Sequence, residues 1–578
     1  MRCRIPANVL ILVSAILLAG LPVAARQAGA GSSQGPAQSA VGAPTVPQAI
    51  KAISAESIRA HTRFLSSNGL EGRGTGQRGG DIAADYIATQ FSLLGLQPAG
   101  ENGSYMQRVP MVGITTDPSS KVSFVPANGK PMEMRLSEDM VVMDETQNPG
   151  SEVDAEVVFV GYGIQAPEYN WDDYKGLDVT GKVLLMLVNE PPSQDANFFK
   201  GPALTYYGRW TYKYEQAARK GAIGAILIHK TEMASYGWDV VRNSWGGERS
   251  YLKVEESPRL KLASWVQYEV GKRLVATASK DLDKLIDQAR NKDFHPIPLP
   301  VRVRSHVASK IRPFSSNNVI AMLPGSDPNL KSQAILYTAH YDHLGIHPDQ
   351  TGDNIYNGAV DNATGSAVLL DMAKSYAQAE KAPARSVIFA AVTGEEQGLL
   401  GSQYLGEHPP VPVGNISLAL NFDGIAPRGI AEDLELSGSE RTSFYPTVQA
   451  IARDFRLEIK PDSNPGAGFY YRSDHFSLAR VGIPSFSVNQ GMKFRGHPLE
   501  WGVQQEREYN EKHYHQPSDE FQEEWDFSGV AEMGRFGFAL GWAAAQQPYL
   551  INWLPGDEFE PARRSSQMRS ADSQKTLP

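Results

Sequence analysis

The sequence has very little cysteine, no surplus of positive charge and no long apolar segment beyond its N-terminus. Cys3 is the only cysteine among 578 residues, so the rest of the chain has neither a thiol nor a disulfide. That is compatible with an oxidising compartment but does not require one. A net charge of −9 argues against a nucleic-acid-binding protein, which usually has a basic patch or stripe. No later segment reaches the roughly 20 apolar residues that a membrane-spanning helix needs.

The N-terminus has the pattern of an export signal. Arg2 and Arg4 precede an apolar stretch at residues 9–21, and the small residues up to Ala25 suit cleavage directly after it. The alternative is an N-terminal membrane anchor, but the stretch is short for a spanning helix, and no cysteine follows it for lipid attachment. We therefore predict a signal peptide at residues 1–25, an exported protein (periplasmic or extracellular), and no stable membrane insertion after cleavage.

The length of the chain predicts two or three domains. Its hydrophobic content of 41% and charged content of 21% are ordinary for a globular protein. A flexible leader rich in Ala, Gly, Ser, Gln and Pro is predicted next to the signal. The predicted organisation is a leader at 26–47, a main domain in two parts at 48–150 and 306–547, an inserted domain at 151–305, and a loose tail at 548–578 with few apolar residues.

Strands and helices alternate over the second part of the main domain. Buried strands are predicted at residues 319–323, 334–339, 386–392, 416–421 and 483–488. Helices are predicted at 364–379, 399–406, 447–455 and 527–545, with two earlier ones at 52–65 and 81–94. This alternation is typical of an α/β fold with a mostly parallel central sheet flanked by helices. The inserted domain is predicted to be β-rich, with strands at 155–160, 182–188 and 222–228.

Polar residues follow three of the predicted strands at the point where each strand ends. His340 follows the strand at 334–339, Glu395 follows 386–392, and Asp423 follows 416–421. Asp361 stands at the start of a predicted helix, and His515 comes far downstream. Because ligands of open α/β sheets gather at the carboxyl ends of the strands, we expect these residues to share one site.

These segments resemble the motifs of the two-zinc exopeptidase family that includes bacterial leucyl aminopeptidases and glutamate carboxypeptidase. The motifs occur in the family's order: His-x-Asp at His340, Asp-Asn-x-x-Gly at Asp361, Glu-Glu at Glu395, Asp-Gly at Asp423 and Tyr-His at Tyr514. The resemblance extends from about residue 50 to about residue 545, and no single motif would carry it alone. It implies the zinc exopeptidase fold and peptide substrates.

Two Zn²⁺ ions are the cofactors that the resemblance implies. Asp361 would bridge them, His340 and Asp423 would complete one site, and Glu396 and His515 would complete the other. Imidazole and carboxylate ligands suit zinc, and catalytic zinc sites keep a position for water. Three ligand carboxylates and one hydroxide would balance the charge of the two ions.

The resemblance also implies roles for residues beside the metals. Glu395 would be the general base. Adjacent residues of a regular strand point to opposite faces, so Glu395 and Glu396 can reach one site only if Gly394 and the end of the strand supply a bend. Asp342 would accept the free ring N–H of His340 and fix its tautomer. Tyr514 would donate a hydrogen bond to the developing oxyanion, as the tyrosine beside the metal histidine does in some relatives.

Each of these residues also has a purely structural interpretation. The paired glutamates could be a solvated face, Asp361 a helix N-cap, and the histidines satisfied structural residues, but their shared position at strand ends favours metal binding. We place His343 at the edge of the site, and assign Asp474 and His475 to the pocket or its support. Residues 74–79 fit a dinucleotide-binding fingerprint, yet no strand precedes them, so a turn is predicted there.

The inserted domain resembles a protease-associated domain. Residues 176–182 and 220–227 match its two clearest segments. Such a domain would cover the site and help to position peptides, or it would only stabilise the fold as a spacer.

The resemblance predicts an exported aminopeptidase that removes N-terminal residues from peptides by a two-zinc mechanism. A carboxypeptidase with the same metal chemistry is an alternative, which the lack of a clear basic cluster for a C-terminal carboxylate slightly disfavours. A catalytically inactive binding protein, as in transferrin receptors, and a one-zinc glutaminyl cyclase are also compatible with the motifs. The preferred side chain and the oligomeric state stay open.

Overall fold

The computed structural model describes the chain except for residues 1–45, 235, 254–257, 349, 463–464 and 576–578. The predicted signal peptide, Cys3 and nearly all of the predicted leader therefore lie outside the described residues. None of the described helices combines the length and the apolar character that crossing a membrane requires.

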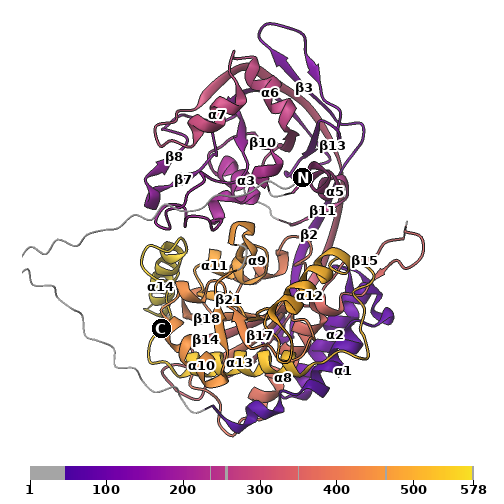
Figure 1. Cartoon of the computed structure of the whole chain (residues 1–578), viewed down its shortest axis with the longest axis vertical. Helices are drawn as coiled ribbons and strands as arrows, with labels where there is room; N and C mark the ends of the chain where they lie inside the picture. Colours follow the sequence, from indigo (N-terminus) through magenta and orange to yellow (C-terminus); the bar gives the residue numbers. More distant parts are fainter. Residues whose placement is uncertain (1–45, 235, 254–257, 349, 463–464, 576–578) are drawn as a thin grey trace, which may run out of the picture. The chain divides into compact units, whose positions relative to one another are not determined.

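A central sheet carries the candidate site. Four adjacent parallel strands form its centre, in the order β21 (Ser485–Ser487), β18 (Ile416–Asn421), β14 (Ala334–His340) and β17 (Ser386–Val392). β14, β17 and β18 are buried along their whole length, as expected for parallel strands covered on both faces. The prediction of an α/β fold with a mostly parallel sheet flanked by helices is confirmed (Figure 1).

Helices cover both faces of the central sheet. One face packs in a large apolar cluster with α1 (Ala55–Leu65), α2 (Arg78–Leu93), α8 (Thr364–Ala377), α10 (Tyr445–Phe455) and α13 (Ser528–Gln546). The other face packs on α9 (Leu400–Glu407) and α11 (His475–Arg480) through Leu405 and Leu478. Figure 1 shows α9 and α11 on one side of the strands and α8 and α13 on the other.

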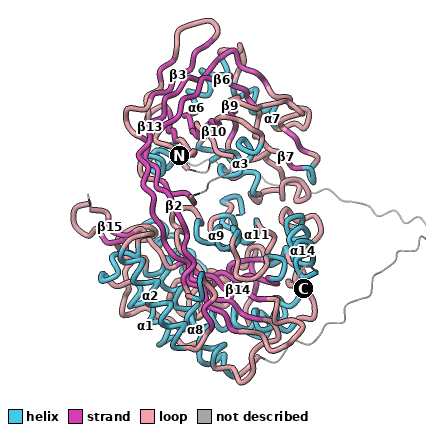
Figure 2. The backbone as a smooth tube through the Cα atoms, turned by 180° about the vertical axis from the view of Figure 1, so that it is seen from behind, coloured by secondary structure: helices cyan, strands magenta, loops and turns pink. Residues whose placement is uncertain are grey.

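One very long strand connects the central sheet with a second sheet. The C-terminal end of β13 (Ile297–Leu323) pairs with β17, its middle with β2 (Met106–Thr116), and its N-terminal part with β6 (Gly150–Phe159). Figure 2 shows β13 as a continuous ribbon through both sheets. The second sheet continues from β6 through β9 (Val183–Leu187), β10 (Gly224–His229), β12 (Leu262–Gln267) and β5 (Met140–Met143).

The inserted domain begins earlier than the predicted boundary at residue 151. β3 (Lys121–Pro126) and β5 contribute Phe124 and Met140 to the apolar cluster that also contains Val157 of β6. α3 (Trp210–Arg219) packs against the same sheet. β3 and β5 pair with β13 and β12, which are distant in sequence, so the sequence alone did not assign them to this sheet.

The prediction of a loose tail at residues 548–578 is wrong. This segment contains α14 (Glu560–Lys575). Arg563 of α14 is 1% exposed and donates hydrogen bonds of 2.8 Å to the carbonyl oxygens of Ile416 and Ile551. This buried guanidinium ties the segment to the first residue of β18, and the buried side chains of Trp553 and Phe559 add apolar contacts.

Candidate metal centre

Three adjacent strands and two loops bring the candidate ligands together. β14 ends at His340, Glu396 follows β17, and Asp423 follows β18. Asp361 lies in an irregular turn before α8, and His515 lies in the loop after α12 (Leu499–Lys512). Since neighbouring parallel strands end at the same edge of a sheet, their polar residues meet there.

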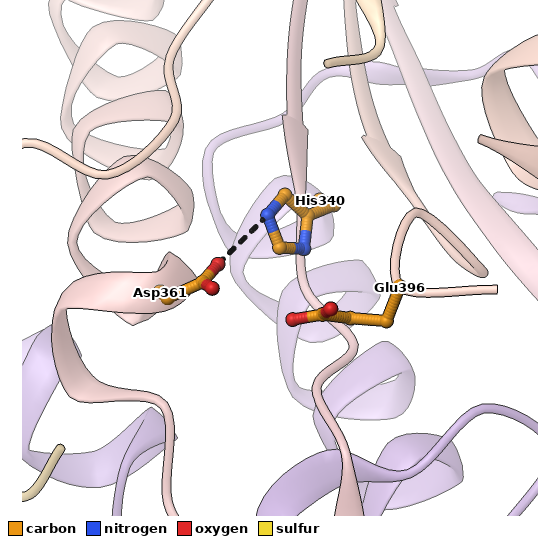
Figure 3. A group of neighbouring side chains, drawn as sticks. All are labelled: His340, Asp361 and Glu396. Atoms are coloured by element: carbon orange, nitrogen blue, oxygen red, sulfur yellow. Dashed lines mark ion pairs between the residues drawn. The ribbon is translucent and has the colours of Figure 1, made fainter. Parts of the chain in front are cut away.

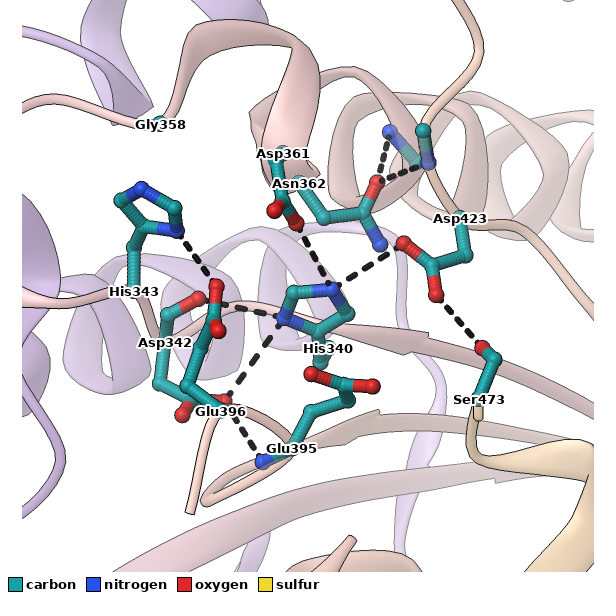
Figure 4. A network of polar contacts seen from close by, with 12 residues as sticks. His340, Asp342, His343, Gly358, Asp361, Asn362, Glu395, Glu396, Asp423 and Ser473 are labelled. Carbon is teal, nitrogen blue, oxygen red and sulfur yellow. Dashed lines mark hydrogen bonds and ion pairs between the residues drawn. The ribbon is translucent and has the colours of Figure 1, made fainter. Parts of the chain in front are cut away.

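Asp361 lies between two histidines. The Nε2 atom of His340 is 3.3 Å from Asp361 Oδ1 and 3.1 Å from Asp423 Oδ1. The Nε2 atom of His515 is 3.3 Å from Asp361 Oδ2 and 3.1 Å from Glu396 Oε2. The two oxygens of one carboxylate therefore face two different imidazoles, each of which also faces a second carboxylate. Figure 4 shows the contacts of His340 with Asp361 and Asp423.

These donor atoms fit zinc. Bonds of about 2.0–2.2 Å at tetrahedral angles separate the ligand atoms of a zinc site by about 3.3 Å. The separations of 3.1 and 3.3 Å around each imidazole match that spacing. Ligand atoms of His340, Asp361 and Glu396 also lie within 4.8 Å of one another (Figure 3). His340, Asp361 and Asp423 would hold one ion, and Asp361, Glu396 and His515 would hold the other.

The charge of the centre favours bound cations. Burial lowers the pKa of His340, but Asp423 and Glu395 outweigh it and raise this pKa well above its ordinary value. Burial also opposes protonation of His515, while hydrogen bonds to Asp361 and Glu396 raise its pKa to about 10. Clustered carboxylates thus require positive charge at the position of each imidazole nitrogen, and metal ions would supply it in place of protons.

The turn that carries Asp361 depends on Gly358. This residue has φ +56°, and a Cβ atom there would lie 2.2 Å from Asp361 O and 2.5 Å from His343 Cγ. The Asp361 N–H donates to Asp519 Oδ2 at 3.1 Å, and the peptide bond that follows Asp361 is cis. Asn362 then donates to the Phe422 carbonyl at 2.9 Å, which ties this turn to the residue before Asp423.

Glu395 and Glu396 follow β17 in a tight turn. Gly394 has φ +66° and supplies the bend that two adjacent glutamates need to reach one site. Figure 4 shows both side chains beside His340. Burial raises the pKa of Glu395 well above its ordinary value, His340 opposes this rise, and Asp423 adds to it.

Two neighbours of the ligands have contacts that differ from the sequence interpretation. His340 Nδ1 lies 3.1 Å from the main-chain carbonyl of Asp342 but 3.8 Å from its carboxylate, so the carbonyl is the closer acceptor. The Asp342 carboxylate instead accepts from Thr75 Oγ1 at 2.8 Å and from the Glu395 N–H at 3.3 Å. His343 is fully buried rather than at the edge, and its Nδ1 lies 2.6 Å from Glu396 Oε1.

The residues predicted for the pocket are buried, whereas Tyr514, predicted to be catalytic, is exposed. Asp474 and His475 are buried, so neither lines an open pocket, and His475 Nδ1 lies 2.9 Å from Ser487 Oγ. Ser473, which the sequence did not single out for its own side chain, donates to Asp423 Oδ2 at 2.5 Å. Tyr514 is 47% exposed, and its ring stacks on that of His515 at a centroid distance of 3.9 Å.

A cleft of about 600 Å³ adjoins the centre. Glu395, Glu396, Tyr514 and His515 line one side of it. The inserted domain contributes Arg209, Trp210, Tyr214 and Arg249, and Arg472 comes from the loop before α11. A molecule in this cleft would contact the proposed base, a metal ligand and the inserted domain together.

The sequence comparison identifies the segment that carries the centre. Residues 318–536 match the model of Peptidase family M28. This M28 segment contains every candidate metal ligand and Glu395.

Individual relatives are similar over parts of their length. A "Probable zinc metalloprotease" of Pyrenophora teres f. teres (strain 0-1) is 28% identical over 302 residues, which cover 43% of this chain and 56% of that protein. "Leupeptin-inactivating enzyme 1" of Streptomyces exfoliatus is 28% identical over 194 residues, or 32% of this chain and 39% of that protein. The chain thus spans about half of these curated relatives at most. An aminopeptidase from Aneurinibacillus sp. strain AM-1 has a TM-score of 0.49 at 19% identity, covering 87% of this chain and 97% of that one.

Proposed function

We propose that this protein is an exported zinc metallopeptidase that binds two zinc ions and removes N-terminal residues from peptides. The observation that carries this proposal is the position of Asp361, whose two carboxylate oxygens face His340 and His515 separately. A bridging carboxylate between two imidazole–carboxylate groups suits a pair of ions better than a single one.

The residues of the cleft supply the parts of a hydrolytic mechanism. Bound zinc would activate a water molecule and polarise the scissile carbonyl. Glu395 would take a proton from the attacking water and pass it to the leaving amine. His343 and Ser473 hold the carboxylates of Glu396 and Asp423 in place. The hydroxyl of Tyr514 would donate to the developing oxyanion.

Replacing the base tests the mechanism. Glu395→Gln keeps the shape of the side chain but cannot accept the proton, so we expect hydrolysis of aminoacyl arylamides to fall by about 10²–10⁴-fold while two zinc ions per chain are retained. Glu407→Gln, at another glutamate that lines the same cleft, is the control and should keep full activity. Full activity of Glu395→Gln would refute the base assignment.

Zinc content and product chemistry distinguish a peptidase from a receptor-like protein and from a cyclase. An inactive receptor-like protein should contain little zinc by elemental analysis, and a one-zinc cyclase should bind a single ion. The cyclase would also release ammonia from an N-terminal glutamine without cutting a peptide bond. The five assembled ligand side chains and Glu395 favour the peptidase.

One observation favours carboxypeptidase activity as a second candidate. Arg209 and Arg472 both line the cleft, and neither forms an ion pair with any carboxylate that the structure describes. Burial and the neighbouring Arg472 lower the pKa of Arg209 to about 10, which still leaves it charged at neutral pH. The basic pair that the sequence did not reveal is therefore present beside the proposed centre.

A panel of short peptides distinguishes the two exopeptidase activities. An aminopeptidase should lose its substrate when the peptide's N-terminus is acetylated and should accept a C-terminal amide. A carboxypeptidase should show the opposite pattern, because Arg209 and Arg472 would bind the free C-terminal carboxylate. Export is tested separately: N-terminal sequencing of the secreted protein should begin at Arg26.

A further inference from the structure

A buried arginine lies behind the proposed metal centre. Arg73 is fully buried, and its guanidinium donates to four main-chain carbonyl oxygens: Leu65 at 2.5 Å, Asn357 at 2.6 Å, Tyr341 at 2.6 Å and Gly358 at 2.8 Å. Among the described residues, none of the carboxylates forms an ion pair with it. The hydrogen bonds of this guanidinium therefore all go to the backbone.

Three of the four carbonyls that Arg73 binds belong to the segments that carry His340 and Asp361, and the fourth, that of Leu65, is at the end of α1. Tyr341 directly follows His340, and Gly358 precedes Asp361 by one short turn. The main chain at Arg73 adds a further contact, because the His343 N–H donates to its carbonyl at 3.2 Å. Two residues on, Thr75 donates to the Asp342 carboxylate at 2.8 Å. Figure 4 shows how closely these two segments approach at His340 and Asp361.

We propose that Arg73, assisted by Thr75, is a positioning residue that fixes the spacing between His340 and Asp361 and thereby the geometry of the two-zinc site. A guanidinium is a rigid planar fork with five donors, so it can hold several carbonyls in one arrangement. A lysine at the same place has one nitrogen on a flexible stem and cannot reproduce that arrangement. Contacts that orient metal ligands typically change metal affinity by about 10–100-fold.

Arg385 provides a matched control elsewhere in the fold. It is also fully buried, and it also donates to main-chain carbonyls, those of Gln547 and Tyr549. Burial lowers the pKa of both arginines to about 10. Arg385 precedes β17 whereas Glu395 follows it, so about 23 Å of strand separates it from the centre.

The experiment compares Arg73→Lys with Arg385→Lys in the full chain. Zinc affinity is measured by competition with a chelator, and kcat and KM are measured with an aminoacyl arylamide. We expect both variants to melt at lower temperature, but only Arg73→Lys to bind zinc about 10–100-fold more weakly, with a lower kcat and a nearly unchanged KM. Equal zinc affinity of Arg73→Lys and wild type would overturn the inference.

Two further measurements keep the test decisive. If Arg73→Lys folds poorly, Thr75→Val is the second variant, because it removes only the hydrogen bond to Asp342. This variant should also bind zinc measurably more weakly than wild type. Unchanged zinc affinity of Thr75→Val would overturn the inference as well. The increase in melting temperature on adding zinc reports affinity even for a weakened fold. The inference rests on the proposed function. A wild-type protein that binds no zinc would refute both the proposed function and the positioning role of Arg73. A wild-type protein that binds zinc, with variants of equal zinc affinity, would refute the positioning role alone.

Discussion

At the scale of single residues, burial determines the protonation state of His475. His475 is 3% exposed, and its Nε2 atom has no hydrogen-bond partner in the described structure. Burial lowers its pKa to about 4 from 6.5, although the charge of Asp423 opposes this change. His475 is therefore neutral at neutral pH, and it supports the loop beside Asp423 instead of exchanging protons with a substrate.

This shift predicts a pH dependence of stability. Between pH 6.5 and about 4 the unfolded chain binds a proton at His475 that the folded chain does not, so the free energy of unfolding falls as the pH falls through that window. The full loss at pH 4 would be about 3 kcal/mol. His475→Gln should remove this part of the slope when metal-free wild type and variant are unfolded in urea at several pH values. Identical slopes for the two proteins would contradict the assignment.

Single residues differ in how far the sequence reveals them. His340, Glu395 and Asp423 were predictable because each follows a short apolar run whose length favours a buried strand. Arg73 was not, because its partners are main-chain carbonyls of Leu65 and of two distant segments, and no side-chain pattern records them. The one available signal was that Arg73 directly precedes the glycine-rich turn predicted at residues 74–79.

At the scale of elements, the turn before α8 is the most constrained part of the centre. Gly358 has φ +56°, and a methyl group there would overlap the Asp361 carbonyl and the His343 ring. Left-handed backbone costs an L-residue roughly 1–2 kcal/mol even without overlap. The steric conflict at Gly358 would add to that cost and displace Asp361, the proposed bridging ligand.

Gly358→Ala should therefore lose zinc affinity as well as stability. The matched control is Gly352→Ala, whose backbone also has positive φ (+86°) but where an added Cβ meets nothing within 4 Å. We expect the control to lose only about 1–2 kcal/mol of stability and to keep two zinc ions. Zinc titration and thermal melts of both variants measure the difference. A Gly358→Ala protein with normal zinc binding would show that the turn tolerates displacement.

Elements with apolar periodicity were predictable, and those without it were not. The bounds of β17 and β18 agree with the predicted strands at 386–392 and 416–421, because every residue in them is buried. α12 has one buried residue, Gly502, so it presents no apolar stripe to recognise. α14 is fixed by the hydrogen bonds of Arg563, which hydrophobic periodicity cannot reveal.

At the scale of the whole molecule, an ion pair and an aromatic contact link the inserted domain to the main domain, and the sequence could not show them. Glu215 of α3 pairs with Arg480 of α11 at 3.0 Å. Tyr206 of the inserted domain packs on Phe476 with ring centroids 5.0 Å apart. The continuous strand β13 supplies the covalent connection, and these side chains limit how the inserted domain can move relative to the M28 segment.

Glu558, just before α14, is a central part of these links. Its carboxylate lies 2.8 Å from Arg441 and accepts from Tyr471 at 2.8 Å, both in the main domain, and it lies 3.5 Å from Lys200 of the inserted domain. Arg441 and Glu558 are largely buried, with side chains 12% and 7% exposed. Removing one partner of a buried ion pair costs about 3–5 kcal/mol, although Asp557 still pairs with Arg441 and should reduce that loss.

Glu558→Gln should loosen the inserted domain without changing the metal centre. We expect a lower melting temperature, two zinc ions per chain, and nearly normal kcat on small arylamides that contact only the centre. KM for longer peptides should rise several-fold, because residues of the inserted domain line the far side of the cleft. The control is Glu520→Gln, which has no ion pair among the described residues. If Glu558→Gln lost zinc, or if its KM for long peptides stayed at the wild-type value, the inserted domain would not be positioning peptides through this carboxylate.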